Sequence, residues 1–511
     1  MNKPFERLAR GSLYLLLGNI TTSIVGALFW IVLAKMLDAE HIGQAMIVIA
    51  FTASIIAFTS SGMQTALAKY ISEYNTKGEY AKTRRVIKMG LILSLLISTV
   101  VGIVLFFLSD SISTIYGSSE GIAFLIAFAS LSYIPANAVV ASISSIYTAY
   151  HRTQYVLLTT TIFQASRLTA SIALASYGFY SLAIIAGFSI AAIINAVIGY
   201  VIMQRISKQD DVIEKVKRER RVEVGEEEEA DGIESKISVK ALLAFSGFNY
   251  IVTGLRTLRN QIGVLTVGTS SIELSAFYGI SSLIANVVGQ VMLSIASMML
   301  PTVSEEITKG NRDGVKHLFS IAMRIALVLN GFLVLLLLIE PTYILRMISH
   351  SYVEASDALR LLVIAYLINS TSNLMASLLN AINRAKDIAV RESVASAIII
   401  ALTLVLVPIL GMEGAALALL IGSLTNLILS YILISKQGFT IHMNVYRAPL
   451  SIAVAFTLGY IVLVVYSNTL IALILALAVH ALFSLAVKAI TRKEISTIIS
   501  VIITRGKVGD A

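Results

Sequence analysis

Three arginines lie in the middle of long apolar stretches, where a charged side chain is costly and marks a candidate functional site. Arg256 and Arg259 are three residues apart in the expected span 241–268, so they lie close together on one helix surface. Arg167 lies near the middle of another expected span, 155–176. A guanidinium stays charged at physiological pH and donates paired hydrogen bonds to a phosphate. This pattern favours a water-filled cationic cavity for an anion, against the alternative that these arginines bond to carbonyls inside a packed bundle.

Amide side chains recur in the same apolar stretches and form a second group of candidates. Many amides in membrane helices simply join neighbouring helices by hydrogen bonds. Asn249, Arg256 and Asn260 are separated by seven and four residues, a spacing that allows one shared helix face. We expect these amides to bind sugar hydroxyls beside the arginines: Asn19, Gln64, Asn249, Asn260, Asn286 and Asn373.

Two features are missing: acidic side chains in the interior of the expected spans, and catalytic motifs anywhere in the chain. We find none of the 30 acidic residues in the interior of an expected span, so the arginines there are predicted to have no acidic partner. The chain has no cysteine, which excludes disulfides and thiolate metal sites. It also has no phosphate-binding loop of the Walker type, no HExxH zinc motif and no serine-centred elbow. We therefore expect no catalytic residue, metal or cofactor, and a protein that is not an enzyme.

The composition excludes a soluble protein. Of the 511 residues, 57% are hydrophobic and 14% are charged, and the mean hydropathy is +0.84. An average soluble domain has about 25% charged residues. The net charge of +9 would suggest nucleic acid in a soluble protein, but in a membrane protein it indicates basic cytoplasmic loops, so we expect no nucleic-acid partner.

The element pattern that follows is all-α and polytopic. A membrane-spanning helix needs about 20 mostly apolar residues. On that criterion we expect about fourteen transmembrane helices, at 11–34, 43–66, 89–108, 122–149, 155–176, 180–203, 241–268, 275–300, 318–339, 357–382, 388–410, 412–435, 448–466 and 469–489. The tightest turns between them fall near Tyr177 and Gly411.

The basic residues predict the orientation of these helices. Most of the 39 lysines and arginines fall in loops on one side if the spans alternate in direction, and two fall on the other side, Lys35 and Arg346. Loops rich in Lys and Arg remain in the cytoplasm. We therefore expect a multi-pass protein of the cell membrane with both termini in the cytoplasm.

An internal repeat divides the chain. Residues 72–78 (SEYNTKG) recur as 304–310 (SEEITKG), and residues 148–152 (TAYHR) recur as 380–384 (NAINR), both at an offset of 232 residues. Six spans separate the equivalent segments, so the two halves enter the membrane in the same direction, as in parallel repeats. We expect a six-helix lobe at 1–203, a charged cytoplasmic linker at 204–240, a second six-helix lobe at 241–435, and two extra helices with a basic tail at 436–511.

The chain resembles the polysaccharide transporters, the O-antigen-type flippases, of the multidrug/oligosaccharidyl-lipid/polysaccharide exporter superfamily. The similarity lies in the opening RLARGSLYLLLGNITTSIVGALFWIVLAKML, in the repeated turns described above, in LLAFSGFNYIVTGLRTLRNQIGVLTVG, and in the order of fourteen spans. It covers the whole chain except 204–240, which is longer and more charged than the usual join in this family.

This resemblance implies two six-helix lobes around a central cavity. It also implies movement of an isoprenoid-(pyro)phosphate-linked oligosaccharide from the cytoplasmic to the outer leaflet by alternating access. The cationic cavity of the family would correspond to Arg256 and Arg259, together with Arg167. A polar residue that is often acidic in relatives is Asn260 or Gln261 here, which leaves coupling to a cation open. The implied partners are the lipid-linked substrate, membrane lipids and glycan-assembly enzymes.

Three alternatives remain open at the level of sequence. A multidrug or organic-cation antiporter of the same fold would need membrane carboxylates, which the expected spans lack. A peptidoglycan-precursor (lipid II) flippase would use a cationic cavity of the same kind. A non-transporting scaffold would bind glycosyltransferases through the linker 204–240.

Overall fold

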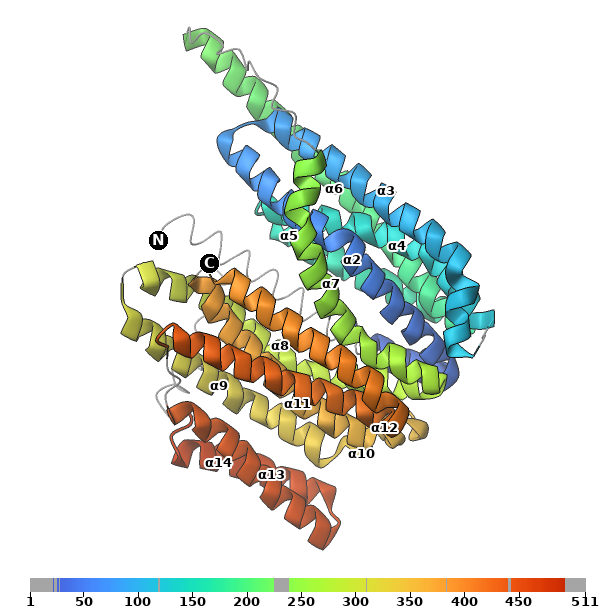
Figure 1. Cartoon of the computed structure of the whole chain (residues 1–511), viewed down its shortest axis with the longest axis vertical. Helices are drawn as coiled ribbons and strands as arrows, with labels where there is room; N and C mark the ends of the chain where they lie inside the picture. Colours follow the sequence, from blue (N-terminus) through green and yellow to red (C-terminus); the bar gives the residue numbers. More distant parts are fainter. Residues whose placement is uncertain are drawn as a thin grey trace, which may run out of the picture. The chain divides into compact units, whose positions relative to one another are not determined.

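The computed structural model is built of helices, and no strand occurs in the part of the chain that it describes (Figure 1). The structure describes residues 28–117, 120–224, 239–308, 310–382, 384–439 and 443–491, together with Thr22, Val25 and Gly26. The expected first span, 11–34, therefore lies mostly outside the described residues, and its described end is helical as far as Met36. The all-α prediction is confirmed.

The first of two compact units runs from Met1 to Gly279. Glycines in the left-handed conformation follow two of its helical segments, Gly78 after α2 and Gly117 after the short turn η1. Glycine favours such positions because it has no Cβ to clash. The long helices of this unit are α2 (Ala39–Lys77), α3 (Tyr80–Ser113), α4 (Glu120–Ala149), α5 (Thr153–Ser176), α6 (Tyr180–Val224) and α7 (Val239–Ser270), and η1 covers Thr114–Tyr116.

The second compact unit runs from Ile280 to Ala511, so the boundary between the units falls within α8. Its elements are α8 (Ile272–Thr308), α9 (Arg312–Ile339), α10 (Pro341–Arg346), η2 (His350–Ala355), α11 (Ser356–Ala381), α12 (Ala385–Lys436), η3 (Met443–Tyr446), α13 (Arg447–Tyr466) and α14 (Thr469–Ala486). Helix α7 packs along α2 and thus belongs to the first unit. The predicted lobe boundaries at 203 and 241 remain a prediction.

Helix α12 is two membrane spans joined by a sharp turn. Its 52 residues would be about 78 Å long as one helix, against about 30 Å for a hydrocarbon core. Gly411 breaks the helix with φ 59° and ψ −136°. The two arms then fold back on each other, because a Cβ on Gly422 in the second arm would lie 2.0 Å from a side-chain carbon of Ile399 in the first. The predicted turn at Gly411 is confirmed.

The helix ends repeat at the offset found in the sequence. Helices α4 and α11 end at Ala149 and Ala381, and α5 and α12 begin at Thr153 and Ala385. Each of these pairs is 232 residues apart, like the repeated turns in the sequence. The two halves therefore share one series of helices in the same order, as predicted.

Ten helices of the described residues are long and apolar enough to cross a membrane: α2, α3, α4, α6, α8, α9, α11, α12, α13 and α14. The two arms of α12 account for one further predicted span. Helices α5 and α7 carry arginines and many hydroxyls, which lower their hydropathy, and they coincide with the spans predicted at 155–176 and 241–268. With the helical residues 28–36, these elements match the fourteen predicted spans of a multi-pass membrane protein.

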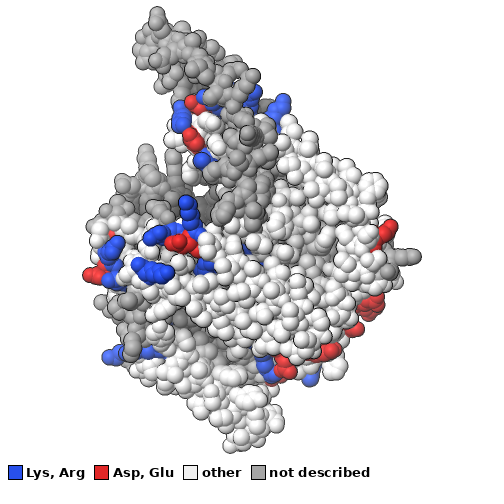
Figure 2. Space-filling view, viewed as in Figure 1, with Lys and Arg blue, Asp and Glu red and all other residues white. Residues whose placement is uncertain are grey.

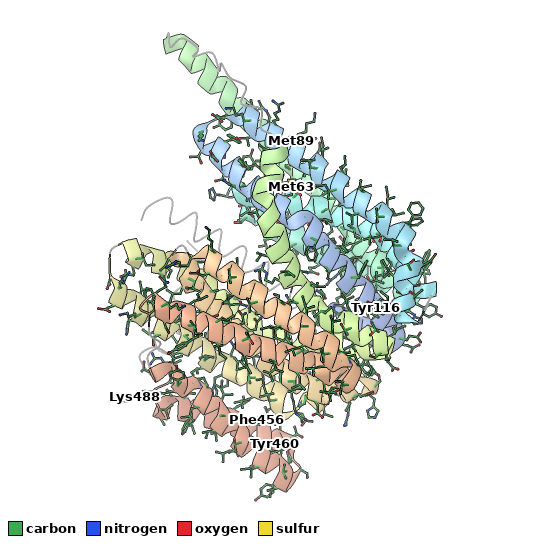
Figure 3. The ribbon with its side chains drawn as sticks, viewed as in Figure 1. Met63, Met89, Tyr116, Phe456, Tyr460 and Lys488 are labelled. Atoms are coloured by element: carbon green, nitrogen blue, oxygen red, sulfur yellow. The ribbon has the colours of Figure 1, made fainter. Side chains whose placement is uncertain are left out.

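Small residues bring the helices of the first unit into close contact. The hydroxyls of Ser94 on α3 and Ser142 on α4 lie 2.8 Å apart, and Ser132 on α4 lies 2.9 Å from Ser189 on α6. Such contacts are typical of membrane bundles, in which lipid provides no hydrophobic driving force between helices. An apolar cluster around Met63, labelled in Figure 3, fills the space between helices α2, α3, α4 and α6.

In the second unit a buried histidine joins the last two helices to α9. The ring of His480 on α14 lies 3.0 Å from the carbonyl oxygen of Val328 and 3.0 Å from the hydroxyl of Ser451 on α13. Gly331 leaves room for this ring, since a Cβ there would lie 2.2 Å from its Nε2 atom. The other side of α13 carries exposed aromatic and aliphatic side chains, including Tyr460, labelled in Figure 3.

Candidate functional site

Arg167 is held in an aromatic box within the first unit. Its guanidinium carbon lies 4.1 Å from the ring centre of Phe29, 4.7 Å from that of Phe188 and 5.9 Å from that of Phe163. Phe163 is one helical turn before Arg167 on α5, Phe188 comes from α6, and Phe29 comes from the helical segment 28–36. An arginine over aromatic rings is stabilised by the negative faces of their π systems, most strongly where water is excluded.

Arg167 also lacks a polar partner within the described part of the chain. The residue is 6% exposed, and its Nε and Nη2 atoms are buried without a hydrogen-bond acceptor among the described residues. The adjacent Gln164 carries a buried Oε1 atom that likewise has no donor there. The box therefore contains a positive charge whose neutralising group is not among the described side chains.

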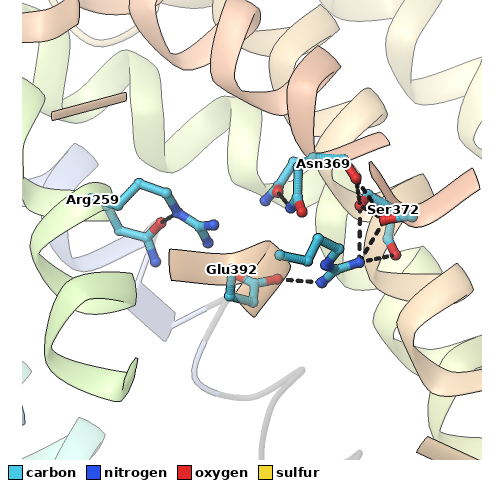
Figure 4. A network of polar contacts seen from close by, with 8 residues as sticks. Arg259, Asn369, Ser372 and Glu392 are labelled. Atoms are coloured by element: carbon cyan, nitrogen blue, oxygen red, sulfur yellow. Dashed lines mark hydrogen bonds and ion pairs between the residues drawn. The ribbon is translucent and has the colours of Figure 1, made fainter. Parts of the chain in front are cut away.

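The two arginines of α7 differ in exposure although they lie three residues apart. Arg259 is 5% exposed, and its Nε donates a hydrogen bond of 3.4 Å to Oδ1 of the neighbouring Asn260 (Figure 4). Arg256 and Asn260 are exposed. The side chain of Arg256 is thus exposed, whereas that of Arg259 is buried.

The other predicted site residues lie in different settings. Gln64 on α2 is half-buried in the first unit. In the second unit Asn286 on α8 is half-buried and Asn373 on α11 is exposed. Asn19 and the side chain of Asn249 lie outside the described residues. Within the first unit, the structure joins Arg259 to Asn260 and surrounds Arg167 with three phenylalanines.

An ion pair that the sequence analysis missed lies in the second unit. Arg391 and Glu392, at the start of α12, are 2% and 5% exposed, and the Nη2 atom of Arg391 donates to Oε1 of Glu392. The Nη1 atom of Arg391 donates to the carbonyl oxygen of Ser372 at 3.0 Å and to the hydroxyl of Ser430 at 2.7 Å (Figure 4). The Ser372 hydroxyl also donates to the carbonyl oxygen of Asn426, 3.0 Å away. The network thus connects α11 with both arms of α12.

This ion pair corrects the expectation that the spans contain no acidic residue. The predicted span began at 388, so Arg391 and Glu392 fell within a turn of its start and were assigned to the cytoplasm. Helix α12 instead begins at Ala385, and the two side chains point into the bundle. Adjacent opposite charges so close to the start of a span were the signal available in the sequence.

Two further arginines, Arg360 and Arg324, bind backbone carbonyls at the ends of other helices. Arg360 pairs with Asp357 at 2.7 Å, and its Nε donates to the carbonyl oxygen of Leu338 at 3.3 Å. The Nη1 atom of Arg324 donates to the carbonyl oxygen of Lys488 at 3.4 Å. On the face drawn in Figure 2, the charged side chains gather in a few groups, and wide stretches between them carry no charged residue. These contacts separate Arg360 and Arg324 from the arginines of α5 and α7.

The candidate residues share the side-chain types that bind oxyanions in proteins. These residues and their contacts offer guanidinium N–H groups, amides and aromatic rings. Such groups bind phosphate oxygens and stack on sugar rings, whereas divalent metals prefer carboxylate and imidazole ligands. Among the described residues there is no group of three His, Asp or Glu side chains that could hold a metal ion.

Two family models match the chain, one in each half. The family described as polysaccharide biosynthesis protein matches residues 8–222, and the MatE family matches residues 255–407. The residues between the two matches, 223–254, include about half of the predicted linker, 204–240. The first family thus covers α2 to α6, with the Arg167 box, and the second begins at the α7 arginines.

Individual proteins are similar over nearly the whole chain. The lipid II flippase MurJ of Bacillus subtilis (strain 168) is 22% identical over 502 residues, which cover 90% of this chain and 88% of that protein. The solved structure of lipid II flippase MurJ in an inward closed conformation has a TM-score of 0.69 at 16% identity, covering 92% of this chain and 98% of that one. An inward-facing multidrug resistance MATE family transporter has a TM-score of 0.65 at 11% identity, covering 83% and 96%.

These similarities agree with the duplicated six-helix units and the two extra helices described above. The relatives are transporters and flippases rather than enzymes. The chain is therefore a multi-pass membrane protein whose two halves match the polysaccharide biosynthesis protein and MatE families, and which is similar over most of its length to a lipid II flippase.

Proposed function

We propose that this protein is a flippase that moves an isoprenoid-(pyro)phosphate-linked oligosaccharide from the cytoplasmic to the outer leaflet of the cell membrane. The observation that carries the proposal is the membrane arginine Arg167, whose buried Nε and Nη2 atoms have no hydrogen-bond acceptor among the described residues, together with the two neighbouring arginines of α7, Arg256 and Arg259. A fixed positive charge inside a membrane protein needs a hydrated cavity or an anionic ligand. The polysaccharide biosynthesis match and the similarity to a lipid II flippase both support a lipid-linked glycan as that ligand.

The chemistry of such a substrate suits the arrangement of the protein. In the proposed cycle the phosphate groups and first sugars enter from the cytoplasm and bind Arg256 and Arg259, while the isoprenoid tail stays in the bilayer. Sugar hydroxyls would bind the predicted amides Asn19, Gln64, Asn249, Asn260, Asn286 and Asn373. Rocking of the two halves then opens the site to the outer leaflet, as is usual for parallel repeats. Both termini remain cytoplasmic in this scheme.

The test of the site uses the α7 arginines in purified protein reconstituted into vesicles. Each charge-assisted hydrogen bond is worth about 1.5–3 kcal/mol, so the double change Arg256→Ala/Arg259→Ala should slow flipping of a labelled lipid-linked oligosaccharide by about 100-fold or more. Arg346→Ala, outside the predicted spans, is the matched control and should flip at the wild-type rate. Undiminished flipping by the double variant, at equal protein abundance, would contradict this site assignment.

A lipid II flippase is the second candidate, favoured by the MurJ similarity over most of the chain. Lipid II is a lipid-linked glycan too, so the same vesicles with each substrate in turn distinguish the two. The multidrug antiporter is less well supported. Glu392 does provide a membrane carboxylate, but Arg391 already neutralises it, which leaves little negative charge for a cationic drug.

The linker 204–240 is where we propose contacts with glycan-assembly enzymes. A transporter without this linker should still flip its substrate, whereas a scaffold without it should lose enzyme binding. Measuring both properties in one deletion variant separates the scaffold alternative from the flippase.

A further inference from the structure

The aromatic box leaves one part of the Arg167 guanidinium unused. Its central carbon lies over the rings of Phe29 and Phe188, close enough for cation–π contact. The Nε–H and one Nη2–H point in the same direction along one edge of the plane. Both of these atoms are buried without an acceptor among the described residues.

This edge, formed by the Nε–H and Nη2–H groups, is the part of an arginine side chain that binds an oxyanion. Two parallel N–H groups match two oxygens of one phosphate or carboxylate, which gives a bidentate pair. The rings stabilise the charge but accept no conventional hydrogen bond, so they leave the edge unsatisfied. A buried donor without an acceptor is costly, and a buried charge without a counter-charge is more so. The missing group is therefore an oxyanion.

The helical segment at the start of the described chain covers this edge. Phe29 lies over the guanidinium, and Gly26, one turn earlier, is so close that a Cβ on it would lie 4.0 Å from Nη2. A larger residue at Gly26 would extend toward the edge. Trp30, which is 7% exposed, packs edge-on against Phe29 with ring centres 5.1 Å apart. Movement of this segment would uncover Arg167 and move Trp30 together.

We propose that Arg167 is a phosphate-binding site, and that the segment carrying Gly26, Phe29 and Trp30 is a cover that opens when a phosphate or diphosphate group binds. This inference rests on the proposed function for the source of the phosphate, namely the head group of a lipid-linked substrate. This phosphate contact is additional to the one proposed at Arg256 and Arg259: the aromatic contacts of Arg167 are with Phe29, Phe163 and Phe188. The binding energy of the head group would then open the cover.

The test measures binding directly. Full-length protein in detergent is titrated with a radiolabelled polyprenyl diphosphate, with the matching polyprenol and with inorganic diphosphate. We expect polyprenyl diphosphate to bind and the uncharged polyprenol to bind at least tenfold more weakly. Binding of inorganic diphosphate would show that the phosphates alone suffice, and its failure to bind would show that the lipid is also required. Equal binding of the polyprenol and the diphosphate would overturn the phosphate site.

Two variants and one control variant test whether this binding occurs at Arg167. Arg167→Met keeps the volume but removes the charge, and should weaken polyprenyl diphosphate binding at least tenfold. Arg360→Met is the matched control, because Arg360 is bound by Asp357 and by a backbone carbonyl at a helix end. Phe29→Leu keeps the charge but removes one ring of the cover, and should tighten binding several-fold because less must be displaced. Unchanged binding in Arg167→Met would overturn the proposal, as would weaker binding in Phe29→Leu.

The cover has its own readout, because Trp30 is the single tryptophan of the chain. Its fluorescence should change on addition of polyprenyl diphosphate to the wild type and should stay constant in Arg167→Met. If binding depends on Arg167 but the fluorescence of Trp30 does not change, the phosphate site is supported and the proposed opening of the cover is contradicted. Because these measurements need no transport, they separate this inference from the proposed function: a protein that binds diphosphate at Arg167 but flips no lipid-linked oligosaccharide would disprove only the latter.

Discussion

The proposed function rests mainly on single charged residues. Their depth in a membrane span could be predicted from the sequence better than the residues that they contact. The sequence placed Arg167 near mid-membrane, but two of its three aromatic contacts come from other elements, which spacing along one helix cannot predict. Arg391 and Glu392 were misassigned because helix ends are uncertain by several residues and both lie beside one. Burial of a charge depends on the tertiary fold, so only the structure identified this pair.

The Arg391–Glu392 pair leads to a prediction about stability. Arg391→Met should lower the free energy of unfolding by about 3–5 kcal/mol, because Glu392 would remain buried without a counter-charge. The double variant Arg391→Met/Glu392→Leu should recover much of this loss. Thermal unfolding in detergent of the wild type, Arg391→Met, Glu392→Leu and the double variant forms a double-mutant cycle. If the single and double variants unfold alike, the pair is not coupled as the structure indicates.

At the scale of elements, the hydropathy pattern and the repeat predicted the order of helices well. The Gly411 turn could be predicted because a span cannot be 52 residues long. The close contact between the first turns of α2 and α8 could not be predicted from the sequence. There the Ser275 hydroxyl donates to the carbonyl oxygen of Gly43 at 3.4 Å, and these two residues are 232 apart, equivalent positions of the repeat.

Gly43 is essential to this contact. A Cβ on it would lie 1.9 Å from the carbonyl oxygen of Ile272, so Gly43→Ala must push α2 and α8 apart. We expect a loss of about 1–3 kcal/mol in the free energy of unfolding, which is typical of overpacking. Gly289→Ala on α8 is the matched control, since its nearest atom is a movable Asn286 oxygen 3.3 Å away. Equal thermal stability of the two variants would show that the crossing tolerates a methyl group.

At the scale of the whole molecule, the distribution of basic residues predicts which side of the membrane each loop faces. The chain has no cysteine, so single cysteines can report this without a background. The exposed positions Lys77 and Ser351 should lie on opposite sides. A membrane-impermeant maleimide added to intact cells should label Ser351→Cys and leave Lys77→Cys unlabelled until the cells are opened. The reverse pattern would invert the orientation, and with it the direction of the proposed transport.

The central claim is that this fold moves an anionic lipid-linked glycan across the membrane. The most direct measurement is the movement of a fluorescent isoprenoid-diphosphate oligosaccharide across vesicles that contain the purified wild-type protein, followed by quenching from outside. We expect the protein to accelerate this movement well above that in protein-free vesicles, and to leave an organic cation of similar size untransported. Acceleration of the cation with no effect on the lipid-linked glycan would contradict the account and favour the antiporter.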